Sequence, residues 1–318
     1  MAVYTEVSFE DLERLLRDYD IGAPLAFKGI AEGVENSNYY LQTDRGAFIL
    51  TLYEKRVNPD DLPFYLGLME HLAKAGIVCP LPVPARDGAL STMLNGRPCA
   101  IVTFLNGLSV RRPSAAHCAA AGAALARLHL AGAGFPLTRA NALGPSGWKP
   151  LVEACEPHAD NAEPGLAALI ANGYRDIAAA WPDLPKGVIH ADLFPDNVLF
   201  MKDEVSGLID FYFACNDMFA YDLAVMLNSW CFEPDGSYNI TKGQALAGAY
   251  KAVRPLSEAE IAAFPILMQG ASLRFLLTRL FDLVHHDPNA LVNPKDPREY
   301  SKKLRFHLRV KDAREYGL

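Results

Sequence analysis

Three residues with oxygen-bearing side chains, Asp192, Asn197 and Asp210, lie close together in the chain and are flanked by apolar residues. The short apolar stretch before Asp192 predicts a buried strand that runs into a polar loop. Residues 198–201 predict a second strand, and residues 202–206 predict a turn that returns the chain toward Asp210. We therefore expect a hairpin that brings the three side chains together at one end.

Two carboxylates and an amide oxygen are the groups that phosphoryl transfer requires. One carboxylate accepts the proton of the attacking hydroxyl, while the other carboxylate and the amide oxygen hold Mg²⁺ on the phosphates of ATP. The spacing H-x-D-x-x-x-x-N from His190 to Asn197, followed by an apolar-flanked Asp210, matches the kinase pattern, although Tyr212 replaces the usual glycine. The pattern predicts Asp192 as catalytic base and Asn197 and Asp210 as metal ligands. A lone H-x-D is commonly structural, but the full pattern between two strands is much rarer.

The chain resembles the aminoglycoside phosphotransferase and choline kinase superfamily over nearly its whole length. Residues 188–200 resemble its catalytic signature, with Ala191 where glycine is usual, and residues 208–211 resemble its metal-binding motif. A closer resemblance, to the homoserine kinase branch, is carried by residues 190–198, 209–215, 221–224 and 273–279. The resemblance implies a protein-kinase-like fold and ATP-dependent phosphorylation of L-homoserine, on the way to threonine.

The residues by themselves leave other functions open. They indicate an ATP-dependent kinase of a small hydroxylated or amine-bearing molecule, so choline, ethanolamine, methylthioribose and aminoglycosides are alternative substrates. Choline would require an aromatic box, which Trp230, Tyr212 and Phe213 could supply. A non-catalytic pseudokinase is a further alternative, because Thr51 stands where the superfamily usually has a lysine or arginine. Retention of all three site residues argues against it.

The chain divides into two regions of different character, which together predict an α+β fold with two lobes. Residues 1–105 read as a small, mostly antiparallel sheet with one inserted helix near residues 60–74, and we expect this lobe to bind the nucleotide. Residues 106–318 read as mainly helical, with one compact hairpin, and we expect this lobe to carry catalysis and substrate binding. A closing helix or strand is expected near the C-terminus.

The resemblance also indicates where the nucleotide would lie. The loop between the first two predicted strands would cover the phosphates, with Gly33 supplying backbone donors and Asn36 and Ser37 supplying side-chain donors. The segment containing Thr103 and Leu105 would pair with adenine through its backbone. As isolated patterns, a surface turn and a buried strand followed by a turn explain these segments equally well.

Two arginines, Arg274 and Arg279, interrupt a strongly apolar predicted helix. A buried guanidinium needs a partner because an unpaired buried charge is costly. Two interpretations remain open: an internal salt bridge, for instance with Asp282 or Asp222, or a bidentate contact with the carboxylate of a substrate. The five-residue step separates the arginines by about 140° around a regular helix, so both need not serve one ligand.

Composition narrows the class of protein. The chain has 318 residues, a net charge of −7 and 51% hydrophobic residues, which favours globular lobes over a nucleic-acid-binding surface. No apolar segment approaches the ~20 residues that span a bilayer, so we expect no membrane association. The six cysteines are widely scattered, which favours reduced thiols and a cytoplasmic location. The sequence leaves the oligomeric state open.

The two carboxylates of the motif predict different losses. Asp192→Asn should lower kcat at least about 10²-fold and spare ATP binding, because only the general base is removed. Asp210→Asn should instead weaken the dependence on Mg²⁺ and the productive binding of ATP. Steady-state kinetics with Mg²⁺ titrations of both variants measures this, and near-normal turnover of Asp192→Asn would exclude it as the base.

Overall fold

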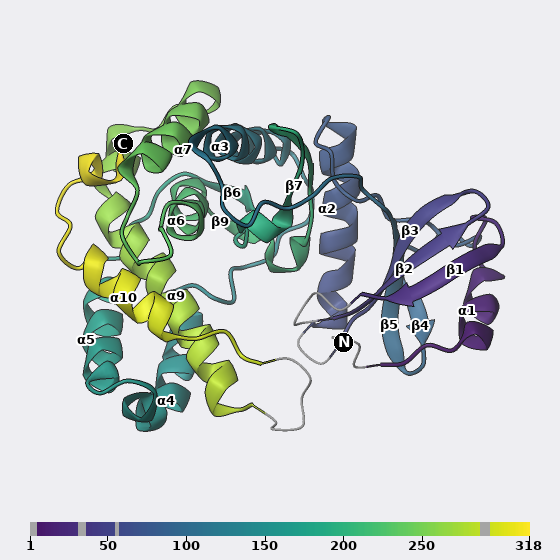
Figure 1. The fold of residues 1–318 in the computed structure, drawn as a ribbon, viewed down its shortest axis with the longest axis horizontal. Helices are drawn as coiled ribbons and strands as arrows, with labels where there is room; N and C mark the ends of the chain where they lie inside the picture. Colours follow the sequence, from purple (N-terminus) through teal and green to yellow (C-terminus); the bar gives the residue numbers. More distant parts are fainter. Residues whose placement is uncertain (1–4, 31–35, 55–56, 287–292) are drawn as a thin grey trace. The chain divides into compact units, whose positions relative to one another are not determined.

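The structure is a computed structural model that describes residues 5–30, 36–54, 57–286 and 293–318. The chain forms two compact units, Met1–Asn106 and Gly107–Leu318, each described below by itself (Figure 1). The first unit contains an antiparallel sheet and the second is mostly helical, so the predicted α+β class is confirmed. In the part of the chain that is described, no helix is long and apolar enough to cross a bilayer. The roles expected of the two lobes stay a prediction.

The first unit is built on a five-stranded antiparallel sheet with the order β1-β2-β3-β5-β4. Asn95 and Gly96 both adopt positive φ, 48° and 76°, and form the tight turn of the last hairpin, as the Asn-Gly pair predicts. The strands are β1 (Pro24–Gly29), β2 (Ser37–Thr43), β3 (Gly46–Leu52), β4 (Thr92–Leu94) and β5 (Arg97–Thr103).

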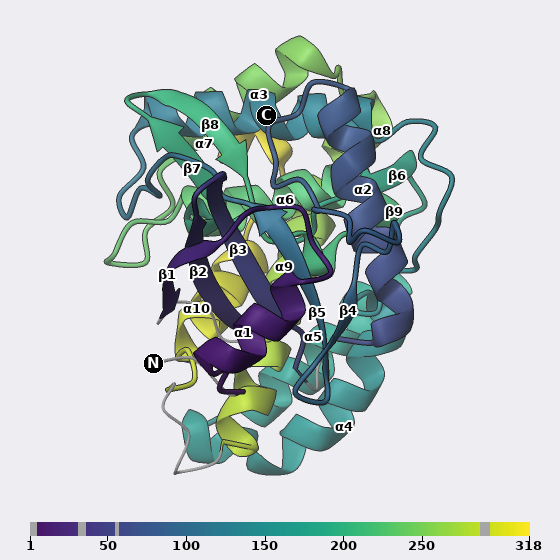
Figure 2. The same ribbon diagram turned by 90° about the vertical axis from the view of Figure 1, so that its right-hand side faces the viewer.

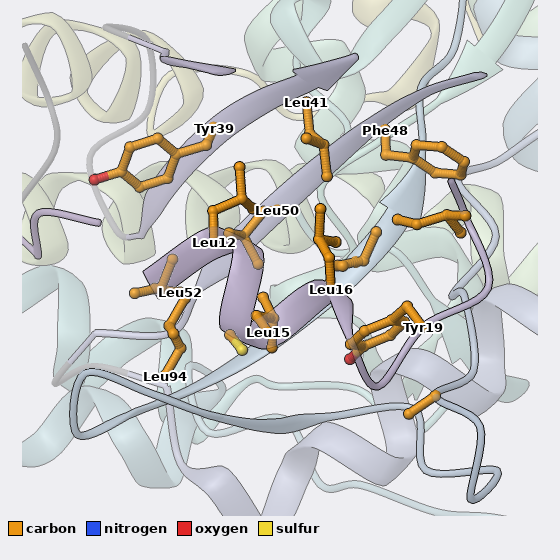
Figure 3. Packing of buried hydrophobic residues seen from close by; sticks show 14 residues of the cluster. Leu12, Leu15, Leu16, Tyr19, Tyr39, Leu41, Phe48, Leu50, Leu52 and Leu94 are labelled. Carbon is orange, nitrogen blue, oxygen red and sulfur yellow. The ribbon is translucent and has the colours of Figure 1, made fainter. Parts of the chain in front are cut away.

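Helix α1 (Phe9–Leu16) covers one face of this sheet (Figure 2). It begins with a capping box in which Ser8 and Asp11 each bond the backbone N–H of the other. Its buried side chains meet the central strands, and Figure 3 shows the resulting cluster around Leu12, Leu16 and Leu50. The inserted helix α2 (Leu62–Lys74) follows a short 3₁₀ turn, close to its predicted position.

The second unit contains most of the helices, and the sequence predicted several of them. Those expected are α3 (Ala115–Ala131), α5 (Leu166–Ala179), α7 (Ile240–Val253) and the closing α10 (Arg298–His307). The pattern predicted one continuous helix over residues 258–285, but the structure has two, α8 (Glu258–Ala262) and α9 (Phe264–Val284), because Pro265 in the first turn of α9 lacks the N–H that a continuous helix needs. The pattern missed α4 (Pro145–Ala162), which contains two internal prolines, and α6 (Phe219–Trp230). Ten of the twelve residues of α6 are buried, so it lacks the one-sided periodicity by which a surface helix is recognised.

The hairpin region differs from its prediction in two respects. Strands β7 (Val198–Met201) and β8 (Glu204–Leu208) pair as expected, but Met201 is opposite Glu204, so the turn comprises only residues 202 and 203 and not 202–206. The strand before the polar loop, β6 (Lys186–Ile189), pairs instead with β9 (Cys215–Met218), which the sequence did not reveal. The polar loop therefore connects two different two-stranded sheets, β6–β9 and β7–β8.

Two glycines in helices test how closely the second unit is packed. A Cβ on Gly270 in α9 would lie 2.2 Å from Cζ3 of Trp181, whereas a Cβ on Gly248 in α7 would meet no atom within 4 Å. We expect Gly270→Ala to lower the free energy of unfolding by about 1–3 kcal/mol, because the core must shift. Gly248→Ala is the control and should raise it by about 0.5–1 kcal/mol through helix propensity. Denaturant titration measures both, and equal effects would contradict the packing seen around Gly270.

Candidate active site in the second unit

The candidate base lies in the loop between β6 and the short 3₁₀ turn Pro195–Asn197. The side chain of Asp192 is 18% exposed, so it is partly accessible to a small molecule. The preceding residue, Ala191, is buried and has φ of 62°, in the left-handed region that glycine adopts without strain. The superfamily that the chain resembles usually has glycine at this position, and the left-handed φ explains why glycine is favoured there.

A single carboxylate, that of Asp222 in α6, anchors the start of this loop. Its Oδ2 accepts the backbone N–H of His190 at 2.7 Å, and its Oδ1 accepts the backbone N–H of Ala191 at 2.8 Å. Oδ2 also accepts the Nε2–H of His129 at 3.0 Å. Burial opposes ionisation of Asp222, but these hydrogen bonds and the histidines hold its pKa below the usual value. The stability this contributes is present above the ordinary carboxyl pKa and is lost as pH falls below it.

The two histidines near the loop have structural positions. His190 Nε2 lies 3.0 Å from the carbonyl oxygen of Ile209, and its Nδ1 accepts the N–H of Asp192 at 3.3 Å, which fits a neutral ring protonated on Nε2. His129 is held between Asp222 and the hydroxyl of Tyr250. Burial lowers the pKa of both rings. The histidine of the H-x-D motif thus joins the loop to Ile209, the residue before Asp210.

The candidate metal ligands approach each other through the backbone. The Ile209 N–H donates to the carbonyl oxygen of Asn197 at 3.0 Å, so the residue before Asp210 is bonded to Asn197. Asn197 Nδ2 donates to the carbonyl oxygen of Asp192 at 2.7 Å and lies 3.4 Å from its carboxylate. The amide oxygen is consequently the atom of Asn197 that suits a cation. Carboxylate and amide oxygens form the donor set that Mg²⁺ prefers, so the residues present fit this ion.

The carboxyl group of Asp192 is electrostatically unusual. Burial raises its pKa to about 8, the Arg274 guanidinium opposes this effect, and the nearby Asp210 carboxylate adds to it. The ionised form binds a proton more strongly than an ordinary carboxylate does, which suits a general base, and its population grows as the pH rises toward and above this pKa.

The sequence matches the phosphotransferase enzyme family over residues 26–256. Homoserine kinases from Azorhizobium caulinodans and Xanthobacter autotrophicus are each 61% identical to it, over 100% of this chain and 99% of theirs. This chain belongs to the phosphotransferase enzyme family.

The fold agrees with this membership. The structure of an amicoumacin kinase in complex with AMP-PNP and Ca²⁺ superposes with a TM-score of 0.71, covering 96% of this chain and 92% of that one, at 15% identity. At that identity the likeness concerns the fold alone. The kinase-like fold predicted from the sequence is confirmed.

The two arginines of α9 in this phosphotransferase both have partners inside the second unit, and these differ from the suggested Asp282 and Asp222. Arg274 donates from Nη1 to the carbonyl oxygen of Ala191, and its Nη2 lies 3.8 Å from Oδ1 of Asp192. Arg279 forms an ion pair of 2.6 Å with Glu299 of α10. A contact of either arginine with substrate stays a prediction.

The residues expected to bind the nucleotide lie in the first unit. Gly33 lies outside the described residues. Asn36 Oδ1 accepts the N–H of Glu54 at 3.3 Å, and the Ser37 hydroxyl donates to the Glu54 carboxylate at 2.7 Å. The hydroxyl of Thr103 accepts the backbone N–H of Leu81 at 2.9 Å, and the half-buried Leu105 follows the end of β5. The side chains of Asn36, Ser37 and Thr103 thus have structural partners in this unit, and nucleotide contact by the five residues stays a prediction.

The third strand carries no cation along its described length, as the sequence predicted for Thr51. The hydroxyl of Thr51 donates to Asn38 Oδ1 at 2.8 Å, and Lys55 and Arg56 lie outside the described residues. A nearby ion pair instead joins Glu54 to Arg97 of β5 at 3.1 Å. The same carboxylate that holds Ser37 is therefore neutralised by a cation from another strand, which no local pattern indicated.

Sequence reasoning also missed several residues that support the site. Trp230 donates from Nε1 to the carbonyl oxygen of Leu193 at 2.8 Å, so the end of α6 holds the loop at a second point beyond the bonds to Asp222. Glu299 of α10 forms ion pairs with both Arg279 and Lys303. These residues lie far from the motif in the sequence, so no short sequence pattern links them to it. A buried tryptophan, whose N–H needs an acceptor, is the one available indication.

Removal of the Asp222 carboxylate should uncouple the loop from α6. Asp222→Ala leaves three buried N–H donors without an acceptor, and we expect a loss of about 3–5 kcal/mol in unfolding free energy, because each unsatisfied buried donor costs about 1–3 kcal/mol. Asp183→Ala, which removes an exposed carboxylate of the same unit, is the control and should have little effect. Denaturant titration compares them, and a similar stability of the two variants would refute the anchoring role.

Proposed function

We propose that this phosphotransferase transfers the γ-phosphoryl group of ATP to the hydroxyl of L-homoserine, forming O-phosphohomoserine and ADP. The main support for the proposal is sequence similarity over the full length of this chain. The homoserine kinases named above are 61% identical to the chain and align with all of it. The geometry of Asp192, Asn197 and Asp210 supports the chemistry, because all three lie on one loop and its neighbouring hairpin.

In the proposed reaction, Asp192 accepts the proton of the substrate hydroxyl as its oxygen attacks the γ-phosphorus. The bond between this phosphorus and the bridging oxygen breaks, and ADP leaves with that oxygen. Hydrogen bonds from Asn197 Nδ2 keep the loop at Asp192 in place, so the base needs little reorganisation. Release of the proton from Asp192 to solvent restores the enzyme, and the partial exposure of this side chain permits it.

The cofactors belong to the same proposal. Asn197 and Asp210 would hold Mg²⁺, which when bound neutralises charge on the phosphates. ATP as the donor is supported by the amicoumacin kinase, whose structure contains AMP-PNP. Gly33, Asn36 and Ser37 would contact its phosphates. The backbone of the segment holding Thr103 and Leu105 would contact adenine.

A role in threonine biosynthesis and a cytoplasmic location complete the proposal. The six cysteines are all free and buried, which agrees with a reducing compartment.

Choline is less well supported as the substrate. The aromatic box considered for it includes Trp230, but that ring is 1% exposed and its N–H is bonded to the loop. The centre of the Phe213 ring lies 5.4 Å from Cζ of Arg274, so a guanidinium already lies over one face of this ring. A quaternary ammonium would need such faces to be free.

Recognition of the homoserine carboxylate is best assigned to Arg279. Its ion-pair partner, Glu299, is half-exposed and is shared with the buried Lys303, so two cations face one carboxylate. Burial opposes ionisation of Glu299, but the charges of Lys303 and Arg279 hold its pKa below the usual value. The surplus positive charge favours an incoming anion. The buried ring of Tyr300 packs against this cluster, with its centre 4.5 Å from the Arg279 guanidinium.

The substrate assignment is tested by ADP release with homoserine, choline, methylthioribose, kanamycin and 3-amino-1-propanol, which is homoserine without its carboxylate. Homoserine should give the highest kcat/KM. Arg279→Met should raise the KM for homoserine at least about tenfold, the scale of a lost charge-assisted contact, and leave turnover of 3-amino-1-propanol unchanged.

Arg305→Met is the control, because it removes an Arg–Glu pair from the outer part of α10. An unchanged KM in Arg279→Met would exclude this arginine as the carboxylate ligand. An absence of homoserine turnover by the wild-type enzyme would end the functional proposal itself.

A further inference from the structure

Arg274 has an environment unlike that of a substrate ligand. Its side chain is 2% exposed, and Nη1 donates to the carbonyl oxygen of Ala191. Nη2 lies 3.8 Å from Oδ1 of Asp192, so one guanidinium contacts two consecutive residues of the loop. Almost none of its surface remains for the carboxylate of a small molecule.

Two aromatic rings restrict the guanidinium further. Its Cζ lies 4.5 Å from the ring centre of Phe275, on the same helix, and 5.4 Å from that of Phe213. Phe213 ends the 3₁₀ turn that follows Asp210. The arginine is thus packed against the segment that carries the candidate metal ligand while it bonds the loop that carries the candidate base. Such cation–ring contacts are attractive and become stronger when they are removed from water.

The bond to Ala191 acts on a residue whose conformation is unfavourable. At a φ of 62° the Cβ of an L-residue crowds its own carbonyl oxygen, so alanine adopts this conformation only where other contacts hold it. Here the N–H of Ala191 is bonded to Asp222 and its carbonyl oxygen to Arg274, so both polar groups of the residue are held. The direction of the chain into Asp192 depends on this conformation, and a shift of ~1 Å at a reacting group can cost 10²-fold in rate.

We infer that Arg274 is a positioning residue for the catalytic base: it fixes Ala191 and the Asp192 carboxylate and does not bind the substrate. The inference rests on the proposed function, because it takes Asp192 as the base. It also divides the two arginines of α9 by role, with Arg274 acting on the loop and Arg279 facing the shared carboxylate of Glu299.

The test is Arg274→Met, which keeps the length of the side chain and removes the donors. We expect kcat to fall about 10²-fold, while the KM values for homoserine and ATP stay within about threefold of wild type. Arg274→Lys retains a charge but lacks the fork of donors, so it should recover part of the loss, to about tenfold below wild type. Arg254→Met is the matched control, since it removes another largely buried arginine paired with a glutamate, Glu260, and should leave kcat unchanged.

Several outcomes would overturn the inference. A tenfold or larger rise in the KM for homoserine with kcat retained would make Arg274 a substrate ligand. If Arg274→Met had the kcat and KM of the wild type, Arg274 would contribute only to packing. If Arg274→Met does not fold, the same comparison is made with Arg274→Lys, where a normal kcat refutes the inference. An inactive wild type with homoserine refutes only the proposed function, and Arg274 is then tested with whichever alcohol the wild type phosphorylates.

Discussion

The carboxylate of Asp222 is the group on which the candidate site most depends. It lies in a largely buried helix and accepts the backbone N–H groups of His190 and Ala191 and a ring N–H of His129 from a second helix. A buried carboxylate is stable only with such partners. The loop cannot leave this position without exposing the charge to an apolar core or leaving its own N–H groups unbonded. The position of Asp192 thus follows from a charge that takes no part in the chemistry.

The parts of the site that the sequence predicted are those encoded within about twenty residues. Asp192, Asn197 and Asp210 are brought together by one hairpin and one turn, and their spacing therefore carries the information. The β7–β8 pairing and the tight turn at Asn95 and Gly96 are local in the same sense. Local geometry restricts such segments strongly, so residue types suffice to identify them.

What the sequence did not predict depends on contacts between distant segments. The pairing of β6 with β9, the bond from Trp230 to Leu193 and the pair between Arg279 and Glu299 each join residues about 20 or more positions apart. A charged residue in an apolar helix indicates that a partner exists, but not which one. Helix α6 illustrates the same limit, because burial on all sides removes the periodicity that reveals a helix.

Two residues other than glycine adopt left-handed φ at the candidate site, and each is one of the candidate site residues or lies next to one. Ala191, with φ of 62°, precedes the candidate base, and Asp210, with φ of 66°, is a candidate metal ligand. Such conformations persist where surrounding bonds over-determine them. Here Asp222 and Arg274 hold the first, while the N–H of Ile209, bonded to Asn197, and its carbonyl, bonded to His190, hold the approach to the second. The buried hydrogen-bond network therefore keeps these polar groups oriented before substrate binds. Because the groups need not reorient during the reaction, the activation free energy of phosphoryl transfer is lower.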